Sequence, residues 1–489
     1  MQTTSAETTG FVRGLNLFDA TMIVIGVMIG SGIFIVSADM ARLIGSPGWL
    51  LMAWVVTGAL TVTAALCYGE LASMLPHAGG VYVYLREAYS PLWGFLYGWT
   101  LFTVIQTGTI AAVAVAFSRF LSILYPPVAE SRYWIAPIHI SQGYALSLST
   151  AQLTAIAVIG LLTWTNSRGL QYGKMVQNIF TSAKVLALGG LILAGIFIGR
   201  NAQATGANFT GFWTLGSFDS SLGVAAASAY GLLVAVSVAQ SGSMFSADAW
   251  HDVTFIGAEV RDPHRNLPRA MAAGVAAVIG LYLLANLTYL LVLPLAEVQH
   301  APSDRVATAV LEKVIPGYGP VLMGIAIMIS TFGCINSLVL SGARAYWAMA
   351  KDGLFFPQAA ALNRAHVPGW SLAVQGVWAA VLVLPRTYDP ATEQYGNLYS
   401  NLLDYVISAA LLFYILTIAA VLRLRRTRPE WERPYCVPAY PWMPLFYITG
   451  AALVLFMLFA YRPATTWPGL VIVLIGGVVY VALRRRSLS

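Results

Sequence analysis

The chain consists of long apolar blocks separated by short polar stretches that carry Arg, Pro and Gly. Most blocks reach about 20 residues, the length that an α-helix needs to cross a bilayer. No polar stretch is long enough for a sizeable soluble domain. The pattern predicts an all-α polytopic membrane protein with twelve transmembrane helices, at residues 15–44, 48–72, 92–118, 151–165, 173–198, 222–259, 268–293, 319–350, 367–385, 398–421, 441–461 and 466–483.

Composition agrees with a membrane protein, since 58% of the 489 residues are hydrophobic and 10% are charged. Soluble domains carry about 25% charged residues. The net charge is +7, and 18 of the 27 basic residues fall in segments predicted to be cytoplasmic. The positive-inside rule for membrane proteins explains this bias, so the charge does not indicate a nucleic-acid partner. We expect a multi-pass protein of the inner (plasma) membrane without a removable signal peptide. Both ends, 1–14 and 484–489, are expected in the cytoplasm.

Cysteine and histidine usage indicates no metal, cofactor or enzymatic chemistry. Two of the three cysteines, Cys67 and Cys334, lie in predicted spans, and Cys436 lies in a predicted cytoplasmic loop. An extracellular disulfide is therefore not expected. The six His and three Cys are scattered without ligand spacing, and no nucleophile triad or phosphate loop is present.

Glycine and polar residues interrupt two of the predicted spans near their centres. The first span holds Gly30, Ser31 and Gly32, although each Gly costs a helix about 1 kcal/mol relative to Ala. The sixth span holds the segment SMFSADAWHD at 243–252. We expect both helices to be broken there, whereas Gly26 alone is better explained by close helix packing.

The two broken spans divide the chain into matching halves. Five spans at 15–198 are followed by five at 222–421, and each set opens with an interrupted helix. An odd number of spans per half gives the halves opposite orientations. The pattern predicts a five-plus-five inverted repeat, and paired interrupted helices are the best sequence pointer to a transporter's midplane site. The last two spans, at 441–483, lie outside the repeat.

A broken helix in lipid exposes backbone groups that cost several kcal/mol each unless something satisfies them. The N–H groups that begin the second half-helix, at Ser31–Phe34, suit a carboxylate. The carbonyl groups that end the first half-helices, near Ile29 and Ser246, suit an ammonium. A carboxylate and an ammonium a few ångströms apart describe an α-amino acid. The sequence therefore predicts a backbone cradle for an amino-acid substrate.

Lys184 lies about 11 residues past Gly173, which places it roughly 16 Å into the bilayer. A charge at that depth costs about 3 kcal/mol or more, so such residues are usually functional. We expect Lys184 to bridge the break in the first span to the eighth span, near Ser330. The alternatives are a structural lysine that faces a wet vestibule and a lysine that couples transport to protons.

Other polar residues within spans allow two roles each. Asp248 can pair a cationic substrate side chain or cap the next half-helix, and capping is the commoner role. Gln106 and Asn336 can reach the substrate or bond helices together, with nothing in their spacing to decide. His251 fits the wall of the pathway better than a gating or proton role.

Four segments resemble motifs of the amino acid–polyamine–organocation (APC) superfamily. They are IGVMIGSGIF (25–34), YGELASMLPHAGGVYVYLREAYSPLWGF (68–95), FIGAEVRDPHRNLPRAM (255–271) and GARAYWAMAKDGLFFP (342–357). The resemblance covers the first ten spans and is nearest to bacterial members of the L-type amino-acid transporter (LAT) family. It implies a LeuT-like fold. In animal members a cysteine between spans 3 and 4 bonds a heavy chain, but 119–150 contains none, so this partner is not expected.

The resemblance also implies roles for individual residues. Phe245 matches the aromatic residue that closes over substrate from the outer side, and Trp250 matches the tryptophan of the same motif. Ala247 and Ala249 stand where the family has Tyr and Gly, which alters the expected side-chain pocket. The matching backbone positions are Gly30, Ser31, Gly32 and Ile33 for the carboxylate and Ser246, Ala247 and Asp248 for the amino group.

The resemblance also aligns Lys184 with the fifth-span lysine of bacterial members, where other transporters of this fold bind sodium. The sequence thus predicts a sodium-independent exchanger of neutral L-amino acids that works by alternating access. One alternative is a proton-coupled symporter that uses Lys184 or His251. Another is a cationic amino-acid or polyamine transporter that uses Asp248. A receptor that binds without transporting is disfavoured, because no large soluble segment is present.

Overall fold

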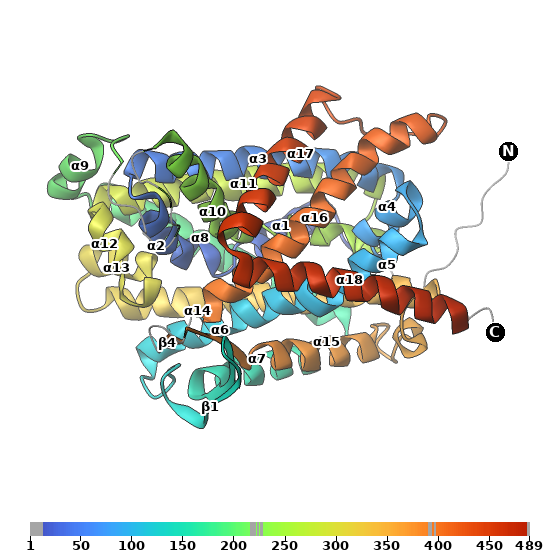
Figure 1. The fold of residues 1–489 in the computed structure, drawn as a ribbon, viewed down its shortest axis with the longest axis horizontal. Helices are drawn as coiled ribbons and strands as arrows, with labels where there is room; N and C mark the ends of the chain where they lie inside the picture. The colour runs from blue at the N-terminus through green and yellow to red at the C-terminus, as the bar shows by residue number, and fades with distance from the viewer. Residues whose placement is uncertain are drawn as a thin grey trace.

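The computed structural model of the chain describes residues 13–215, 222, 224, 228–389, 394–395 and 398–486. Long helices run side by side and form a bundle (Figure 1). Helices α9, α12 and α13 gather at one end of this bundle, and α4 lies at the other (Figure 1). Residues 1–12 and 487–489 of the predicted cytoplasmic ends lie outside the described residues, as does most of 222–227 in the predicted sixth span.

Each predicted span corresponds to helical structure with similar bounds. In chain order these helices are α1 (Leu17–Met28) with α2 (Gly32–Ile44), α3 (Pro47–Met74), α5 (Pro91–Thr100) with η1 (Leu101–Ile105) and α6 (Gln106–Leu124), α7 (Thr150–Asn166), α8 (Leu170–Phe197), α10 (Ala229–Ser246) with η3 (Trp250–Thr254), α11 (Pro263–Val292), α14 (Gly319–Lys351), α15 (Gly369–Leu382), α16 (Leu398–Thr427), α17 (Trp442–Tyr461) and α18 (Pro463–Arg486). Short helices connect them: α4 (Val81–Ala88), α9 (Ala202–Phe209), η4 (Gly257–Glu259), α12 (Leu295–Gln299), η5 (Pro302–Asp304), α13 (Val306–Val314) and η6 (Pro357–Ala360).

Eight helices of the described chain are long and apolar enough to cross a membrane, or up to nine if the bent pair of α1 and α2 counts as one span. The protein is therefore a multi-pass membrane protein. Helices α7 and α15, with 17 and 14 residues, are shorter than that test requires, and α10, with 18 residues, is not among the helices that pass. The count of twelve spans stays a prediction.

A small antiparallel sheet departs from the all-α expectation, which is wrong in this respect. Strands β1 (Tyr133–Ser141) and β2 (Tyr144–Ser149) form a hairpin, to which β3 (Pro385–Asp389) and β4 (Gln394–Tyr395) add. The hairpin turns at Gln142 and Gly143. Its signal was the aromatic and β-branched content of these short segments, which the much stronger periodicity of the spans obscured.

The third predicted span is a helix of 34 residues that contains one π-helical turn, η1. The Thr107 hydroxyl donates to Phe102 O, five positions earlier, at 2.7 Å. Such turns occur frequently at functional sites. Here the turn ends directly before Gln106, a side chain that the sequence marked as a candidate.

A buried ion pair joins three segments at one end of the bundle. Arg344 on α14 donates to Glu259 on η4 at 3.0 Å, and both side chains are about 1% exposed. The Glu259 carbonyl also accepts from the amides of Gly14 and Leu15, which precede α1. The start of the first span, the end of the sixth and the end of the eighth are thereby held together.

Replacing Arg344 by Gln is expected to destabilise the protein, because the Glu259 carboxylate then stays buried without its cation. Breaking a buried pair in this way costs about 3–5 kcal/mol. Thermal unfolding in detergent, followed by size-exclusion chromatography, measures the effect. The matched control is Lys313→Gln, which breaks the exposed pair with Glu297 and should cost less than about 1 kcal/mol. Equal losses in the two variants would contradict this account.

Candidate functional site

The first break separates α1 from α2, whose axes differ by 41°. Helix α1 ends at Met28, and Ile29 follows with non-helical dihedral angles, φ −76° and ψ 81°. Helix α2 starts at Gly32, and no side chain caps its N-terminus. The first amides of a helix have no acceptor within it. The amides of Gly32 and Ile33 therefore form a positive helix end suited to a carboxylate.

The carbonyl groups freed by this break are bonded by side chains from two other helices. The buried Lys184 ammonium on α8 donates to Gly26 O at 2.7 Å and to Ile29 O at 3.0 Å. The Ser330 hydroxyl on α14 donates to Ile29 O at 3.0 Å and lies 3.3 Å from Gly30 O. Lys184 therefore contacts the first break and shares the Ile29 carbonyl with Ser330 of the eighth span. Its role in transport stays a prediction.

Tyr282 on α11, which was not predicted as a site residue, connects the two breaks. Its hydroxyl lies 2.8 Å from Met28 O and 3.0 Å from Ser246 O, within hydrogen-bond distance of both. Ser246 O was expected to meet a substrate ammonium. A carbonyl oxygen has two lone pairs, so Ser246 O can accept a second hydrogen bond beside Tyr282. A polar ring within an apolar span was the only signal for Tyr282.

The second break follows the end of α10 at Ser246. Ala247 and Asp248 lie in a non-helical turn, and Ala249 has a positive φ of 63° before η3 begins. The two breaks meet closely, because a Cβ on Gly32 would lie 2.2 Å from Ser246 Oγ and 2.8 Å from Ser246 Cα. Only glycine fits at position 32 in this structure.

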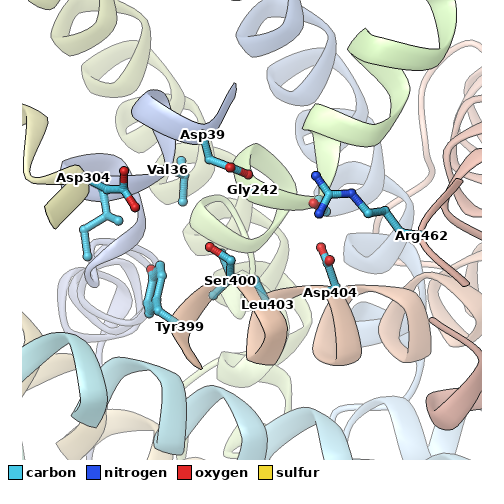
Figure 2. A pocket seen from close by; sticks show the side chains of 11 residues that line it. Val36, Asp39, Gly242, Asp304, Tyr399, Ser400, Leu403, Asp404 and Arg462 are labelled. Atoms are coloured by element: carbon cyan, nitrogen blue, oxygen red, sulfur yellow. The ribbon is translucent and has the colours of Figure 1, made fainter. Parts of the chain in front are cut away.

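Tyr399 on α16 separates the first break from a pocket of about 410 Å³. Its hydroxyl lies 2.9 Å from the Ser31 hydroxyl, and its ring packs edge-on against Phe245 with centroids 6.1 Å apart. Phe245 is thus next to the break, as its predicted role in closing the site requires. Figure 2 shows the pocket beyond Tyr399, whose charged lining residues are Asp39, Asp304, Asp404 and Arg462.

Asp248 follows the end of α10 and lines a second hollow. Its Oδ1 accepts a hydrogen bond from the Tyr414 hydroxyl at 2.5 Å, and its carboxylate also bonds the amide of Ala249. With Ala247 and Trp250 it lines this hollow of about 310 Å³ between α3, α10, α16 and α17. Ala249 is itself the N-cap of η3, and no side chain caps this helix, so the bond to its amide is not a capping contact. Both roles considered for Asp248 stay predictions.

Gln106 and Asn336 make contacts between helices. Gln106 donates to Leu338 O at 2.8 Å and to Asp252 Oδ2 at 3.0 Å, which links α6 to α14 and to η3. Asn336 accepts from Asn166 at 2.7 Å, which links α14 to α7. Gln106 therefore contacts η3, the helix that follows the second break, whereas Asn336 contacts α7.

Metal chemistry has no candidate centre in the part of the chain that the structure describes. Within those residues no group of three or more His, Cys, Asp or Glu side chains is placed to hold a metal ion. The three cysteines are free thiols, two of them buried. The chemistry available at the breaks is that of backbone amides and carbonyls, one lysine ammonium, the Asp248 carboxylate and several hydroxyl groups.

Known proteins share the sequence pattern that builds this arrangement. The family model described as amino acid permease matches residues 15–480. The chain is 27% identical over 487 residues to the serine/threonine exchanger SteT of Bacillus subtilis (strain 168), with 99% of both chains covered. It is 29% identical over 440 residues to b(0,+)-type amino acid transporter 1 of Homo sapiens, covering 90% of this chain and 81% of that one. Asc-type amino acid transporter 1 of Mus musculus is 29% identical over 477 residues, covering 96% and 81%.

Helices that cross the membrane and break around a buried backbone site define a membrane transporter of small molecules. Because the family match spans almost the whole chain, this protein belongs to the amino acid permease family, within the APC superfamily. The resemblance predicted from the four motifs is thereby confirmed. The relatives are named as amino-acid transporters and exchangers, not as enzymes.

Gly32→Ala is expected to impair transport, because the new methyl group collides with Ser246 where the two breaks meet. Overpacking of this kind costs about 1–3 kcal/mol, which corresponds to roughly 5- to 150-fold in affinity. Exchange of labelled amino acid in liposomes measures the loss. Gly189→Ala is the matched control, since a Cβ there meets no atom within 4 Å. The prediction fails if both variants exchange amino acids like the unmodified protein.

Proposed function

We propose that this protein is a sodium-independent exchanger of neutral L-amino acids that works by alternating access. Its relatives include a protein named as a serine/threonine exchanger and several named as amino acid transporters. Amino-acid transport is thus the activity that the family supports. Sodium independence, exchange and the preference for neutral substrates are inferred from Lys184 and from the geometry of the two breaks.

The observation that carries the proposal is the Lys184 ammonium at the first break. Its positive charge lies 2.7 Å from Gly26 O and 3.0 Å from Ile29 O, two carbonyl groups of the broken helix. Carbonyl oxygens are also the ligands that a sodium ion would need there. A fixed ammonium supplies the same charge without an ion from solution. A sodium ion is therefore not needed to bind the carbonyl groups of the first break.

Substrate recognition follows from the two breaks. The amides of Gly32 and Ile33 bind the carboxylate of the amino acid. The Ser246 carbonyl accepts from its ammonium with the lone pair that Tyr282 leaves unused, while Ile29 O, which already accepts from Lys184 and Ser330, lies beside it. Phe245 then closes the site from the side of the pocket lined by Tyr399. Closure on one side and opening on the other complete the cycle.

Neutral substrates fit because the cradle supplies one positive helix end and one set of carbonyl groups, which a zwitterion balances. Asp248 is the exception, since its carboxylate lies in the hollow behind the second break. A substrate with a cationic side chain that reached this hollow would favour a cationic amino-acid transporter instead. The bond from Tyr414 to Asp248 favours the structural role, because it already satisfies the oxygen concerned.

The topology that we propose has twelve spans, with repeats at 15–198 and 222–421 and two further helices at 441–483. Both repeats open with a broken helix, α1–α2 in one and α10–η3 in the other, which supports the inverted relation. Both ends of the chain then lie in the cytoplasm, and the protein resides in the plasma membrane. We expect no disulfide-linked heavy chain, because residues 119–150, between the third and fourth spans, contain no cysteine.

Purified protein in liposomes tests the proposal in sodium-free buffer at equal pH on both sides. Labelled L-alanine and L-leucine should enter vesicles preloaded with neutral amino acids and should not accumulate in empty ones. Equal uptake into empty vesicles would overturn exchange, and a requirement for sodium would overturn the role of Lys184. Uptake of L-arginine alone would favour the cationic alternative through Asp248.

Lys184→Met is expected to lower exchange, since it removes the charge that satisfies Gly26 O and Ile29 O. Hydrogen bonds to charged groups contribute about 1.5–3 kcal/mol, so exchange should fall roughly 10- to 150-fold. Lys351→Met is the matched control, because this exposed lysine lies at the end of α14 against Trp347. Unchanged exchange by Lys184→Met, in protein that elutes as a single species, would contradict the proposed role.

A further inference from the structure

Four titratable side chains form a connected row behind the second break. The Tyr414 hydroxyl lies 2.5 Å from Asp248 Oδ1 and 3.4 Å from His251 Nδ1. The other ring nitrogen of His251, Nε2, lies 3.8 Å from Asp252 Oδ1. Asp248, His251 and Asp252 are all at least nine-tenths buried. No step of the exchange described above uses this row.

Asp252 has one satisfied and one unsatisfied oxygen. Its Oδ2 accepts from Ser341 at 2.5 Å and from Gln106 at 3.0 Å. Its Oδ1 is buried and has no hydrogen-bond partner. A buried acceptor without a partner costs about 1–3 kcal/mol, and more if it is charged. A proton on Oδ1 would remove this unsatisfied charge, and the nitrogen that faces Oδ1 at 3.8 Å is His251 Nε2, which also lies 3.5 Å from the Tyr97 hydroxyl.

The surroundings offer little to balance two buried carboxylates. Among the described residues, the titratable side chains that face the row from neighbouring elements are Tyr68 on α3, Tyr97 on α5, Cys334 and Tyr346 on α14 and Tyr447 on α17. All of these groups are neutral at physiological pH in their ordinary state. The negative charge of Asp248 and Asp252 must therefore be neutralised mainly by a proton bound within the row itself.

We propose that His251 and Asp252 hold one exchangeable proton between them, and that Tyr414 connects this pair to Asp248 at the second break. The protein then binds a proton as well as an amino acid. The site deepens the proposed function, since it lies beside the carbonyl groups that would meet the substrate ammonium. Proton occupancy and substrate binding are linked through the charge on Asp248.

The transfer along the row balances atom by atom. The Asp252 Oδ1 proton passes to His251 Nε2 as the His251 Nδ1 proton passes to Tyr414 Oη. Tyr414 releases its own proton to Asp248 Oδ1. Asp252 ends as the carboxylate and Asp248 as the carboxylic acid, while His251 changes tautomer and Tyr414 stays neutral. An ammonium at the break favours the reverse direction, because it stabilises a charged Asp248.

Infrared difference spectra between pH 5.5 and pH 8.5 test the site in the purified full-length protein, whether or not it transports. The unmodified protein should show the carbonyl stretch of a buried carboxylic acid that changes with pH. Asp252→Asn should remove most of this signal. The matched control Glu312→Gln, which removes an exposed carboxylate on α13, should keep it. A signal unchanged in Asp252→Asn would overturn the proposal.

Exchange in liposomes provides the second readout and separates the two proposals. A single proton site predicts that exchange by the unmodified protein varies at least about threefold over this pH range. The Asp252→Asn profile should be nearly flat. If Asp252→Asn does not fold, His251→Gln takes its place and should shift the infrared signal. Exchange without pH dependence or infrared signal overturns the proton site alone, whereas the infrared signal without any exchange overturns the proposed function alone.

Discussion

Unwound backbone inside an apolar protein must find hydrogen-bond partners, and this constraint shapes the centre of the molecule. Each unsatisfied group in hydrocarbon costs several kcal/mol. Lys184, Ser330 and Tyr282 reach the first break from three different helices and satisfy its carbonyl groups. The amides of Gly32 and Ile33 are left at an uncapped helix end. Most of the carbonyl groups are thus satisfied by the protein, Ser246 O keeps one lone pair for an ammonium, and the amides of Gly32 and Ile33 are free for a carboxylate.

The contacts that cover the breaks differ between the two ends of the helix bundle. At one end, the buried pair of Arg344 and Glu259 holds α14, η4 and the segment before α1 together. At the other end, a pocket extends inward as far as Tyr399, which bonds Ser31 and packs against Phe245 (Figure 2). One aromatic layer therefore lies between the pocket and the breaks, whereas a network of charged and backbone contacts lies on the opposite side.

Local sequence signals predicted the parts of the site that are built from backbone. Gly30, Ser31 and Gly32 weaken a helix in an apolar span, and the matching interruption in the sixth span allowed the first break to be predicted. Lys184 was noticed because a charge is costly at that depth. The positions of Tyr282 and Tyr399 at the breaks could not be predicted from such local signals. Each is one tyrosine among 24 in the chain, and its importance depends on which distant helix it faces.

The same distinction applies to the fold. Apolar periodicity gave the positions of the helices, because one span of about 20 residues carries a strong signal. The hairpin of β1 and β2 has only 15 residues in its two strands and lies between spans, so its weaker alternation was overlooked. The contact of Gln106 with Asp252 arises from the packing of α6 against η3 and α14, which no spacing in one helix encodes.

The most direct test of the central claim is an experimental structure of the protein with a bound neutral amino acid in sodium-free buffer. The account predicts density between the two breaks, with the carboxylate against the amides of Gly32 and Ile33 and the ammonium near Ile29 O and Ser246 O. Lys184 should keep its bonds to Gly26 O and Ile29 O. Density only in the pocket beyond Tyr399, or a metal ion in place of the Lys184 contact, would contradict it.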